Sequence, residues 1–409
     1  MRCTVNLMLD RGPLIARTPE ISRRQLLSRL GAVGSAVLTA SVAAACTASR
    51  RAHRSAPPNA LDVRDFGARG DARTDDTSAI AAALTALRSG QILVFPAGTY
   101  RHSGVLSVAT EGVTLEGPGR LYATAEQTSA LRIDAPGVTV RRMVVAMGST
   151  TRRWSDEDQH KIFVAPHEGI RITDVRIEGS AAAGLFCYGA RDFRFTRVLV
   201  GDTRADGIHM TNASQYGTVE SPRVMRSGDD GVAVVSYATD PGPCHHIEVF
   251  SPQVRTTRGG RGVSVVGGED ISYHDIGIDR SAAAAVYIAC EDSRFVTRSV
   301  ARVLVGGGAL TNANTNPADD QGSVLVYNGR AGASVDHVTI SDLSVTGTRT
   351  TASRQIGAVA DGPTDVLSKI VFRNLRLADE PTPFQGNAPL NSFTLVDVRA
   401  AGTEVRPTQ

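Results

Sequence analysis

The sequence is poor in lysine and in aromatic side chains. Only Lys161 and Lys369 are lysines among 409 residues, and the three aromatic residue types together make up 5%. This scarcity of large side chains, combined with 40 glycines, favours many short strands and turns over a bundle of long helices. The hydrophobic fraction of 42% is still sufficient for a buried core, which excludes a largely disordered chain.

Most of the chain also lacks an excess of positive charge. The formal net charge is +3, but residues 1–45 alone hold six arginines against Asp10 and Glu20. The remaining residues are therefore close to neutral and contain no polybasic segment. This distribution excludes nucleic acid as the expected partner.

Cysteines and long apolar runs are scarce as well. Cys187, Cys244 and Cys290 do not have the spacing of a metal site, and no disulfide framework is expected. Cys187 and Cys290 lie in apolar, strand-like runs, where a small buried thiol is the simplest interpretation. No apolar run reaches the roughly 20 residues that a membrane-spanning helix requires.

Residues 1–45 have the features of an export signal. Residues 22–27 (Ser-Arg-Arg-Gln-Leu-Leu) resemble a twin-arginine motif, and an apolar run of small residues follows over 30–45. Cys46 then stands where a lipoprotein signal would place its lipidated cysteine, and a plain secretory cleavage nearby is the alternative. We therefore expect an extracellular or cell-surface protein, which contacts a membrane only through such a lipid. Residues 46–59 are predicted to form a linker.

A pattern with a period near 23 residues repeats through the centre of the chain. Each unit reads small, apolar, variable, apolar, and five units begin at Gly184, Gly207, Gly231, Gly262 and Ala285. The starts are 23, 24, 31 and 23 residues apart, so the third interval contains a loop of about eight extra residues near 240–246. Such a repeat predicts an all-β solenoid in which the strands of successive coils stack in parallel.

The repeat predicts where the side chains point. The third position of each unit is expected to face solvent, and the second and fourth positions are expected to face the core. The inward ladders should then contain Leu185, Ile208, Val232, Val263 and Val286, followed two positions on by Cys187, Met210, Val234, Val265 and Ile288.

The same alignment brings acidic residues together. Asp206, Asp230 and Arg261 each directly precede the small residue of their unit, so they should form a row on one edge, with Asp206 and Asp230 about 5 Å apart. Asp229 lies one residue earlier, so its side chain should point in a different direction from those of Asp206 and Asp230. Three carboxylates this close cannot all ionise freely, so one should keep its proton near neutral pH, as a general acid must.

The ends of the solenoid need protection from solvent. Residues 77–88 are rich in alanine and leucine and are predicted to form a helix over the first coil, with Asp75 or Asp76 as the N-cap. We expect the β-helix domain to span residues 60–400, with a loop over 312–321 and a short tail over 401–409.

The segment that opens this domain resembles a known superfamily. Leu61-Asp-Val-Arg-Asp-Phe-Gly-Ala68, Thr74-Asp-Asp-Thr77 and Val94-Phe-Pro-Ala-Gly-Thr-Tyr100 follow one another as in the pectate-lyase-like β-helix superfamily. The resemblance implies a right-handed parallel β-helix. It does not define the reaction, because the superfamily contains lyases, hydrolases and epimerases.

The centre of the chain is similar to glycoside hydrolase family 28, the polygalacturonases. Arg204-Ala-Asp-Gly207 and Gly228-Asp-Asp-Gly231 match that family's Asn-Thr-Asp-Gly and Gly-Asp-Asp motifs and keep all three aspartates. Gly260-Arg-Gly262 and Val286-Tyr-Ile-Ala289 replace its Gly-His-Gly and Arg-Ile-Lys motifs, which puts polygalacturonate as the substrate in doubt. The resemblance implies that Asp229 is the general acid and that Asp206 and Asp230 activate water for inversion.

Residues near the cluster are candidates for substrate binding. Arg261 would either hold an anionic or hydroxyl-rich sugar or lower the pKa of Asp229, and a surface salt bridge to Asp230 is the alternative. His209 and Tyr287 occupy outward positions where they would bind hydroxyl groups or stack on a sugar ring.

A histidine pair and the only tryptophan are further candidates. His245 and His246 are expected to overhang the site and bind substrate rather than a metal, because no third ligand is apparent. Trp154 would either serve as a platform for a sugar or hold its loop in place.

Three functions agree with these patterns. The first is an exported, monomeric inverting glycoside hydrolase that acts on a polysaccharide and needs no cofactor. The second is a polysaccharide lyase or epimerase, in which Ca²⁺ binds the aspartates and Arg261 assists proton abstraction. The third is a β-helix that binds glycans without turnover. Arg261, Tyr287 and Ala289 replace residues of the family 28 motifs, and such replacements are also expected in an active site that has lost its activity.

Overall fold

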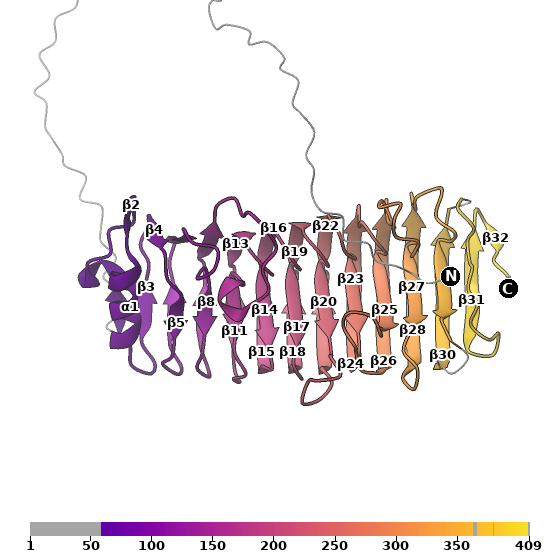
Figure 1. The fold of residues 1–409 in the computed structure, drawn as a ribbon, viewed down its shortest axis with the longest axis horizontal. Coiled ribbons are helices and arrows are strands. Elements are labelled where there is room, and N and C mark those ends of the chain that lie inside the picture. Colours follow the sequence, from indigo (N-terminus) through magenta and orange to yellow (C-terminus); the bar gives the residue numbers. More distant parts are fainter. Residues whose placement is uncertain (1–58, 363–365, 379, 408–409) are drawn as a thin grey trace, which may run out of the picture. The chain divides into compact units, whose positions relative to one another are not determined.

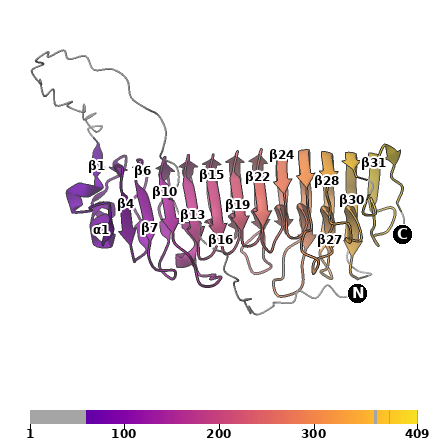
Figure 2. The same ribbon diagram turned by 90° about the horizontal axis from the view of Figure 1, so that it is seen from above.

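A computed structural model describes residues 59–362, 366–378 and 380–407, and the expected export signal and Cys46 lie outside them. The described residues form a parallel β-helix of stacked coils, shown side-on in Figure 1 and from above in Figure 2. Only β31 and β32 pair antiparallel among the named strands. The predicted all-β solenoid is therefore confirmed.

One sheet, here called sheet B, contains one strand from each of ten coils. Its strands are β5 (Leu106–Val108), β8 (Leu131–Ile133), β11 (Ile162–Val164), β14 (Leu185–Tyr188), β17 (Ile208–Thr211), β20 (Val232–Val235), β23 (Val263–Val266), β25 (Val286–Cys290), β27 (Val324–Asn328) and β29 (Ile356–Ala360).

The remaining strands belong to a second, 22-stranded sheet. In the first coils it runs as two rows, which merge where β24 pairs with both β21 and β22. One row contains β1 (Ala60–Asp62), β3 (Ile92–Val94), β6 (Thr114–Glu116), β9 (Thr139–Arg141), β12 (Arg171–Thr173), β15 (Arg191–Thr196), β18 (Gln215–Glu220) and β21 (His245–Phe250). The other contains β2 (Asp71–Asp75), β4 (Thr99–His102), β7 (Arg120–Ala123), β10 (Val144–Met147), β13 (Arg176–Ser180), β16 (Leu199–Thr203), β19 (Arg223–Ser227) and β22 (Gln253–Thr257). The merged strands are β24 (Gly268–Asp279), β26 (Val300–Thr311), β28 (Ser334–Thr346), β30 (Val366–Leu377), β31 (Phe393–Ala400) and β32 (Thr403–Glu404).

The register of sheet B confirms the sequence alignment. Ile208 pairs with Leu185 on one side and with Val232 on the other, and the pairing continues through Val263 to Val286. All ten side chains of the two predicted inward ladders have no exposed surface. Burying each such aliphatic side chain contributes about 1.5–3 kcal/mol, so the ladders supply much of the stability of the solenoid.

A helix covers the first coil, as predicted. The helix α1 (Thr77–Ala86) follows the short 3-10 helix η1 (Val63–Phe66), and its buried side chains join the main core. Asp76 is the N-cap residue, but its carboxylate accepts hydrogen bonds from the backbone N–H groups of Arg69 and Gly70. Asp75 accepts the N–H of Thr77 instead, so both acidic residues have structural roles here.

The extra residues of the long repeat interval lie where they were expected. They connect β20 to β21, and the predicted loop over 312–321 connects β26 to β27. Cys187, Cys244 and Cys290 are all buried, and burial raises the pKa of Cys187 and of Cys244 to about 12. Among the described residues, no helix has the length and apolar character needed to cross a membrane.

One charged side chain lies inside the solenoid. Lys161, immediately before β11, has no exposed surface, and its Nζ donates a hydrogen bond to the backbone carbonyl of Ser129. Burial lowers the pKa of Lys161 to about 7. A lysine whose pKa is lower in the folded state than in the unfolded chain lowers the free energy of unfolding as pH decreases from the unfolded pKa to the folded pKa, here from 10.5 to about 7.

Replacing Lys161 with methionine should therefore stabilise the protein most below neutral pH. We expect the gain in the free energy of unfolding to be larger at pH 6 than at pH 9, by on the order of 2 kcal/mol. Urea unfolding at both pH values measures this difference. Lys369→Met is the matched control, because the second lysine is exposed. An equal gain at pH 6 and pH 9 would contradict a desolvated ammonium group.

Candidate active site

Two aspartates and an arginine stand in a row where the strands of sheet B begin. Asp206, Asp230 and Arg261 precede β17, β20 and β23 by the same two residues, so the register aligns them. The backbone N–H of Asp230 donates to Oδ1 of Asp206 at 2.9 Å, and the N–H of Arg261 donates to Oδ1 of Asp230 at 2.7 Å. The predicted row is therefore confirmed, and each carboxylate binds the backbone of the following coil.

Asp229 joins this row although it comes one residue earlier in its coil. One carboxylate oxygen from each of Asp206, Asp229 and Asp230 lies within 4.8 Å of the others. The Asp229 side chain is 27% exposed, whereas those of Asp206 and Asp230 are 11% and 7% exposed. Asp229 is thus the carboxylate that solvent, or a ligand, can reach most easily.

Asp206 is held in its ionised form. Nδ1 of His209 lies 2.5 Å from Oδ2 of Asp206, and both side chains are buried. Burial alone would raise the pKa of Asp206, but the hydrogen bond with His209 and the positive charge of Arg153 outweigh it and hold this pKa below its usual range.

Asp230 behaves in the opposite way. Its carboxylate accepts the Ser264 hydroxyl at 2.5 Å and the Arg261 backbone N–H. Burial raises the pKa of Asp230 to about 7, and the negative charges of Asp229 and Asp206 add to this effect, while Arg261 opposes it. One carboxyl of the cluster thus keeps its proton near neutral pH, as expected from the sequence.

His209 and Tyr287 do not face solvent, contrary to the expectation for the third position of the repeat. They are only 5% and 3% exposed. The ring of His209 stacks on Phe186 with 4.8 Å between ring centroids. Tyr287 belongs to a second apolar cluster on the outer face of sheet B, which also contains Val235, Val266, Leu325 and the partly buried Tyr237. The prediction was wrong because it considered only the alternation of side chains along a strand. Side chains on the outer face of sheet B pack against one another, and this packing removes His209 and Tyr287 from solvent.

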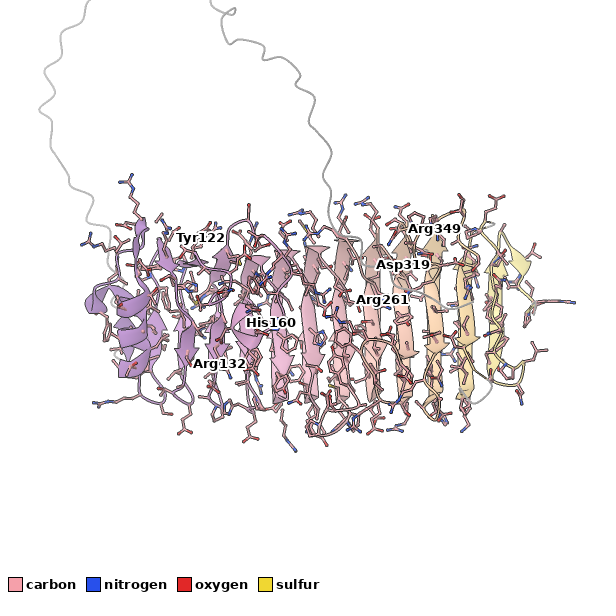
Figure 3. All side chains as sticks on the ribbon, in the orientation of Figure 1. Tyr122, Arg132, His160, Arg261, Asp319 and Arg349 are labelled. Carbon is pink, nitrogen blue, oxygen red and sulfur yellow. The ribbon has the colours of Figure 1, made fainter. Side chains whose placement is uncertain are left out.

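Arg261 is held by several neighbours at once. Its guanidinium bonds to Oε1 of Glu291 at 3.0 Å and to Gln321 at 3.4 Å, and it lies 4.1 Å from the centre of the Tyr287 ring. Its distance to the Asp230 carboxylate is 3.9 Å. The salt bridge to Asp230 considered as the alternative therefore forms, but it is largely buried and is one of several contacts that hold the guanidinium. Figure 3, in the orientation of Figure 1, labels Arg261 among the coils toward the C-terminus from His160.

The insertion before β11 contributes an arginine that the sequence patterns did not reveal. Nη1 of Arg153 lies 2.5 Å from Oδ2 of Asp229. The neighbouring Trp154 donates its indole N–H to Glu126 at 2.5 Å, and the Arg152 guanidinium stacks on its ring at 3.6 Å. Of the two roles considered for Trp154, the structure favours holding this loop in place.

The expectation that His245 and His246 overhang the aspartates was wrong. These residues begin β21, beyond the far end of β20, whereas Asp230 stands before its first residue. Both rings pack against Tyr216, and their Nδ1 atoms lie 2.8 Å apart. The long loop between β20 and β21 displaces the histidine pair from the cluster. His245 instead lines a cavity of about 510 Å³ together with residues including Asn212, Gln215 and Glu269.

The chemistry of the cluster also allows a cation. Carboxylate oxygens are the ligands that Ca²⁺ prefers, and Asp206, Asp229 and Asp230 each offer one at mutual distances that a single ion can bridge. Arg153 and Arg261 oppose this by supplying positive charge at the same place.

Comparison with known proteins agrees with this architecture. A family model described as "Rhamnogalacturonase A/epimerase, pectate lyase-like" matches residues 60–286. The chain belongs to this family. The expected pectate-lyase-like β-helix is thereby confirmed, whereas the narrower assignment to glycoside hydrolase family 28 is not. No curated protein matches the chain.

This member of the rhamnogalacturonase and epimerase family shares its fold with several solved structures. The catalytic domain of a glycoside hydrolase family 87 α-1,3-glucanase in complex with nigerose is similar, with a TM-score of 0.67 and 15% identity, over 84% of this chain and 65% of that chain. The catalytic unit of a thermostable family 87 α-1,3-glucanase from Streptomyces thermodiastaticus strain HF3-3 has a TM-score of 0.62 and 19% identity, over 85% of this chain and 69% of that chain. The present chain thus spans less than two thirds of the first of these domains, and at these identities the likeness shows the fold alone.

The pairing of Arg261 with Glu291 should be important for stability. Glu291→Ala leaves the guanidinium without its nearest carboxylate, and we expect the free energy of unfolding to fall by about 3 kcal/mol. Asp202→Ala breaks the pair of Asp202 with Arg226, in which both side chains are about half exposed, and should lower the same quantity by less than about 1 kcal/mol. Equal losses in urea unfolding would show that Glu291 does not support Arg261.

Proposed function

We propose that this protein is an exported glycoside hydrolase that cleaves a polysaccharide with Asp206, Asp229 and Asp230. One observation carries the proposal: three carboxylates lie within 4.8 Å of one another, and their environments separate them, with one pKa lowered and one raised to about 7. Carboxyl groups whose pKa values are pushed apart are what paired acid and base catalysis requires.

The arrangement suggests a role for each carboxyl group. Asp206, held ionised by His209, is the base that removes a proton from the attacking water. Asp229 is the carboxyl that the leaving glycosidic oxygen can approach, so it is the group through which a proton reaches that oxygen. Asp230 lies beside it and keeps a proton near neutral pH, so it acts as the proton source rather than as a second base. In the reaction, this proton goes to the leaving oxygen, the bond from that oxygen to the anomeric carbon breaks, and the hydroxyl of water forms the new bond.

Inversion of the anomeric carbon fits the burial of Asp206 better than retention does. The oxygens of the cluster approach more closely than the roughly 6.5–9.5 Å that is usual between inverting carboxyl groups. Retention, however, requires a carboxylate that contacts the anomeric carbon directly. Asp206 is buried and each of its oxygens already has a hydrogen-bond partner, so it would act through a water molecule.

A neutral glycan is the substrate class that the charges favour. Arg153 is paired with Asp229, and Arg261 with Glu291 and Asp230, so neither arginine is available to a uronate carboxylate without losing an acidic partner. The similar family 87 enzymes are α-1,3-glucanases, one of them solved with nigerose. We therefore propose α-glucans as the first substrates to test, with polygalacturonate as the anionic comparison.

A calcium-dependent polysaccharide lyase is the second candidate, supported by the convergence of the three carboxylates. Bound Ca²⁺ would acidify the proton next to a uronate carboxylate, and Arg261 lies within the same cluster. Ultraviolet absorbance from a new C=C bond and loss of activity in EDTA would identify a lyase. Reducing ends released without either signal would identify a hydrolase.

Asp229→Asn should abolish hydrolysis and leave the melting temperature unchanged, because the residue is partly exposed and the amide keeps its size. We expect a loss in kcat of at least about 100-fold, typical for removal of a general acid. The measurement is the release of reducing ends from a panel of glucans and uronans, with Asp202→Asn as an exposed control. A fully active Asp229→Asn variant would rule out the mechanism. Binding without turnover by the unmodified protein would favour the non-catalytic alternative.

The pH profile should reflect the proton held by Asp230. The acid must be protonated and the base ionised, so kcat/KM should fall as pH rises through about 7 and should persist into acidic solution because the pKa of Asp206 is lowered. Since Arg261 lowers the pKa of Asp230, Arg261→Gln should move the alkaline limb to higher pH. Arg226→Gln, which changes an exposed arginine, should leave it in place. A downward shift in Arg261→Gln would contradict the assignment.

A further inference from the structure

We propose that His209 is a positioning residue that directs Asp206 toward the attacking water, rather than a residue that binds the sugar. This inference rests on the proposed hydrolase function. Its basis is the contact between Nδ1 of His209 and Oδ2 of Asp206 at 2.5 Å. A carboxylate can only accept hydrogen bonds, so Nδ1 carries the proton and the imidazole donates.

Stacking fixes the plane of the His209 ring. Its centroid lies 4.8 Å from that of Phe186, and the two planes differ by 6°. Phe186 stacks in turn on His160 at 3.9 Å, and Nδ1 of His160 accepts the backbone N–H of Ala183 at 3.0 Å. Three rings from adjacent segments thus form one stack that a backbone hydrogen bond anchors. His209 cannot rotate away from Asp206 without leaving this stack.

The burial of His209 argues against a direct contact with substrate. The side chain is only 5% exposed, and its Nε2 is buried without a hydrogen-bond partner among the described residues. The imidazole therefore has one polar contact, and that contact is with Asp206. Asp206 receives a second hydrogen bond at Oδ1 from the Asp230 backbone, so both oxygens are oriented and lone pairs remain for a water molecule.

Other charged groups also act on Asp206, and their effects must be separated from that of His209. Arg153 lowers its pKa, whereas Asp229 and Asp230 belong to the same acidic cluster. His160 is the third ring of the stack, and burial lowers its pKa to about 3. It is therefore neutral at pH values well above 3 and does not add a positive charge there. His209 lowers the pKa of Asp206 both through its hydrogen bond and through its charge, so a variant that keeps only a hydrogen-bond donor should keep only part of the effect.

Two variants separate these properties. His209→Asn keeps a side-chain N–H donor near the position of Nδ1 and removes the ring. His209→Phe keeps a stacking ring and removes the donor. We expect the acidic limb of the kcat/KM profile to move up by about 1 pH unit in His209→Phe and by clearly less in His209→Asn, which keeps the donor but not the charge, with KM unchanged in both.

The same comparison can be made without turnover. Asp206 has a lowered pKa in the folded protein, so its contribution to stability is present above the usual aspartate range and is lost as pH falls. Because this loss runs from the unfolded-state pKa down to the folded-state pKa, it should be smaller in His209→Phe, so the melting temperature should fall less between pH 7 and pH 3 in His209→Phe than in His209→Asn. If no glycan is cleaved by the unmodified protein, the proposed function fails, and the melting curves still decide the role of His209.

Two results would overturn the inference. A His209→Phe variant whose pH profile and acid stability match the unmodified protein would show that the hydrogen bond does not influence Asp206. A raised KM with unchanged pH limits in both variants would show instead that His209 binds the sugar.

Discussion

Hydrogen bonds between successive coils of sheet B determine where the candidate catalytic carboxyl groups of this protein lie. Because strands of sheet B pair in parallel without a register shift from β11 to β25, a residue type repeated at the repeat period forms a row along the solenoid. Asp206 and Asp230 belong to this hydrogen-bonded lattice, since each accepts the backbone N–H of the residue one coil further on. The interactions that stack the coils therefore also orient two of the three candidate catalytic groups.

This arrangement links stability and chemistry at the same residues. A carboxylate buried at the coil edge destabilises the fold unless donors surround it, and different donors lead to different protonation. Both carboxyl groups have a backbone N–H donor and a nearby arginine, but Asp206 also accepts a hydrogen bond from His209 and is ionised, whereas Asp230 accepts one from a hydroxyl and has a raised pKa. The asymmetry between acid and base thus follows from small differences between neighbouring coils of one repeat.

The periodic part of the molecule was predictable from the sequence. The small residues at the start of each unit defined the register, and from it followed the burial of Ile208 and Met210 and the alignment of Asp206 with Asp230. Ser264 could also have been found, because it occupies the third position in the coil after Asp230 and its hydroxyl reaches that carboxylate. Contacts of this kind can be predicted from the register of neighbouring coils and the alternation of side chains along each strand.

Contacts made by the insertions were not predictable, because a repeat contains no information about how its loops fold. Arg153 reaches Asp229 from a segment 76 positions away, and Glu291 and Gln321 approach Arg261 from two different loops. The position of His245 was misjudged for the same reason, since the loop before it is long.

We propose that these carboxyl groups hydrolyse a glycosidic bond through a water molecule activated by a buried base. The most direct test is proton NMR of the first reducing end released from an α-glucan of known configuration, recorded before mutarotation. We expect the new reducing end to have the configuration opposite to that of the cleaved bond. Release of the same configuration, or of an unsaturated sugar, would contradict it.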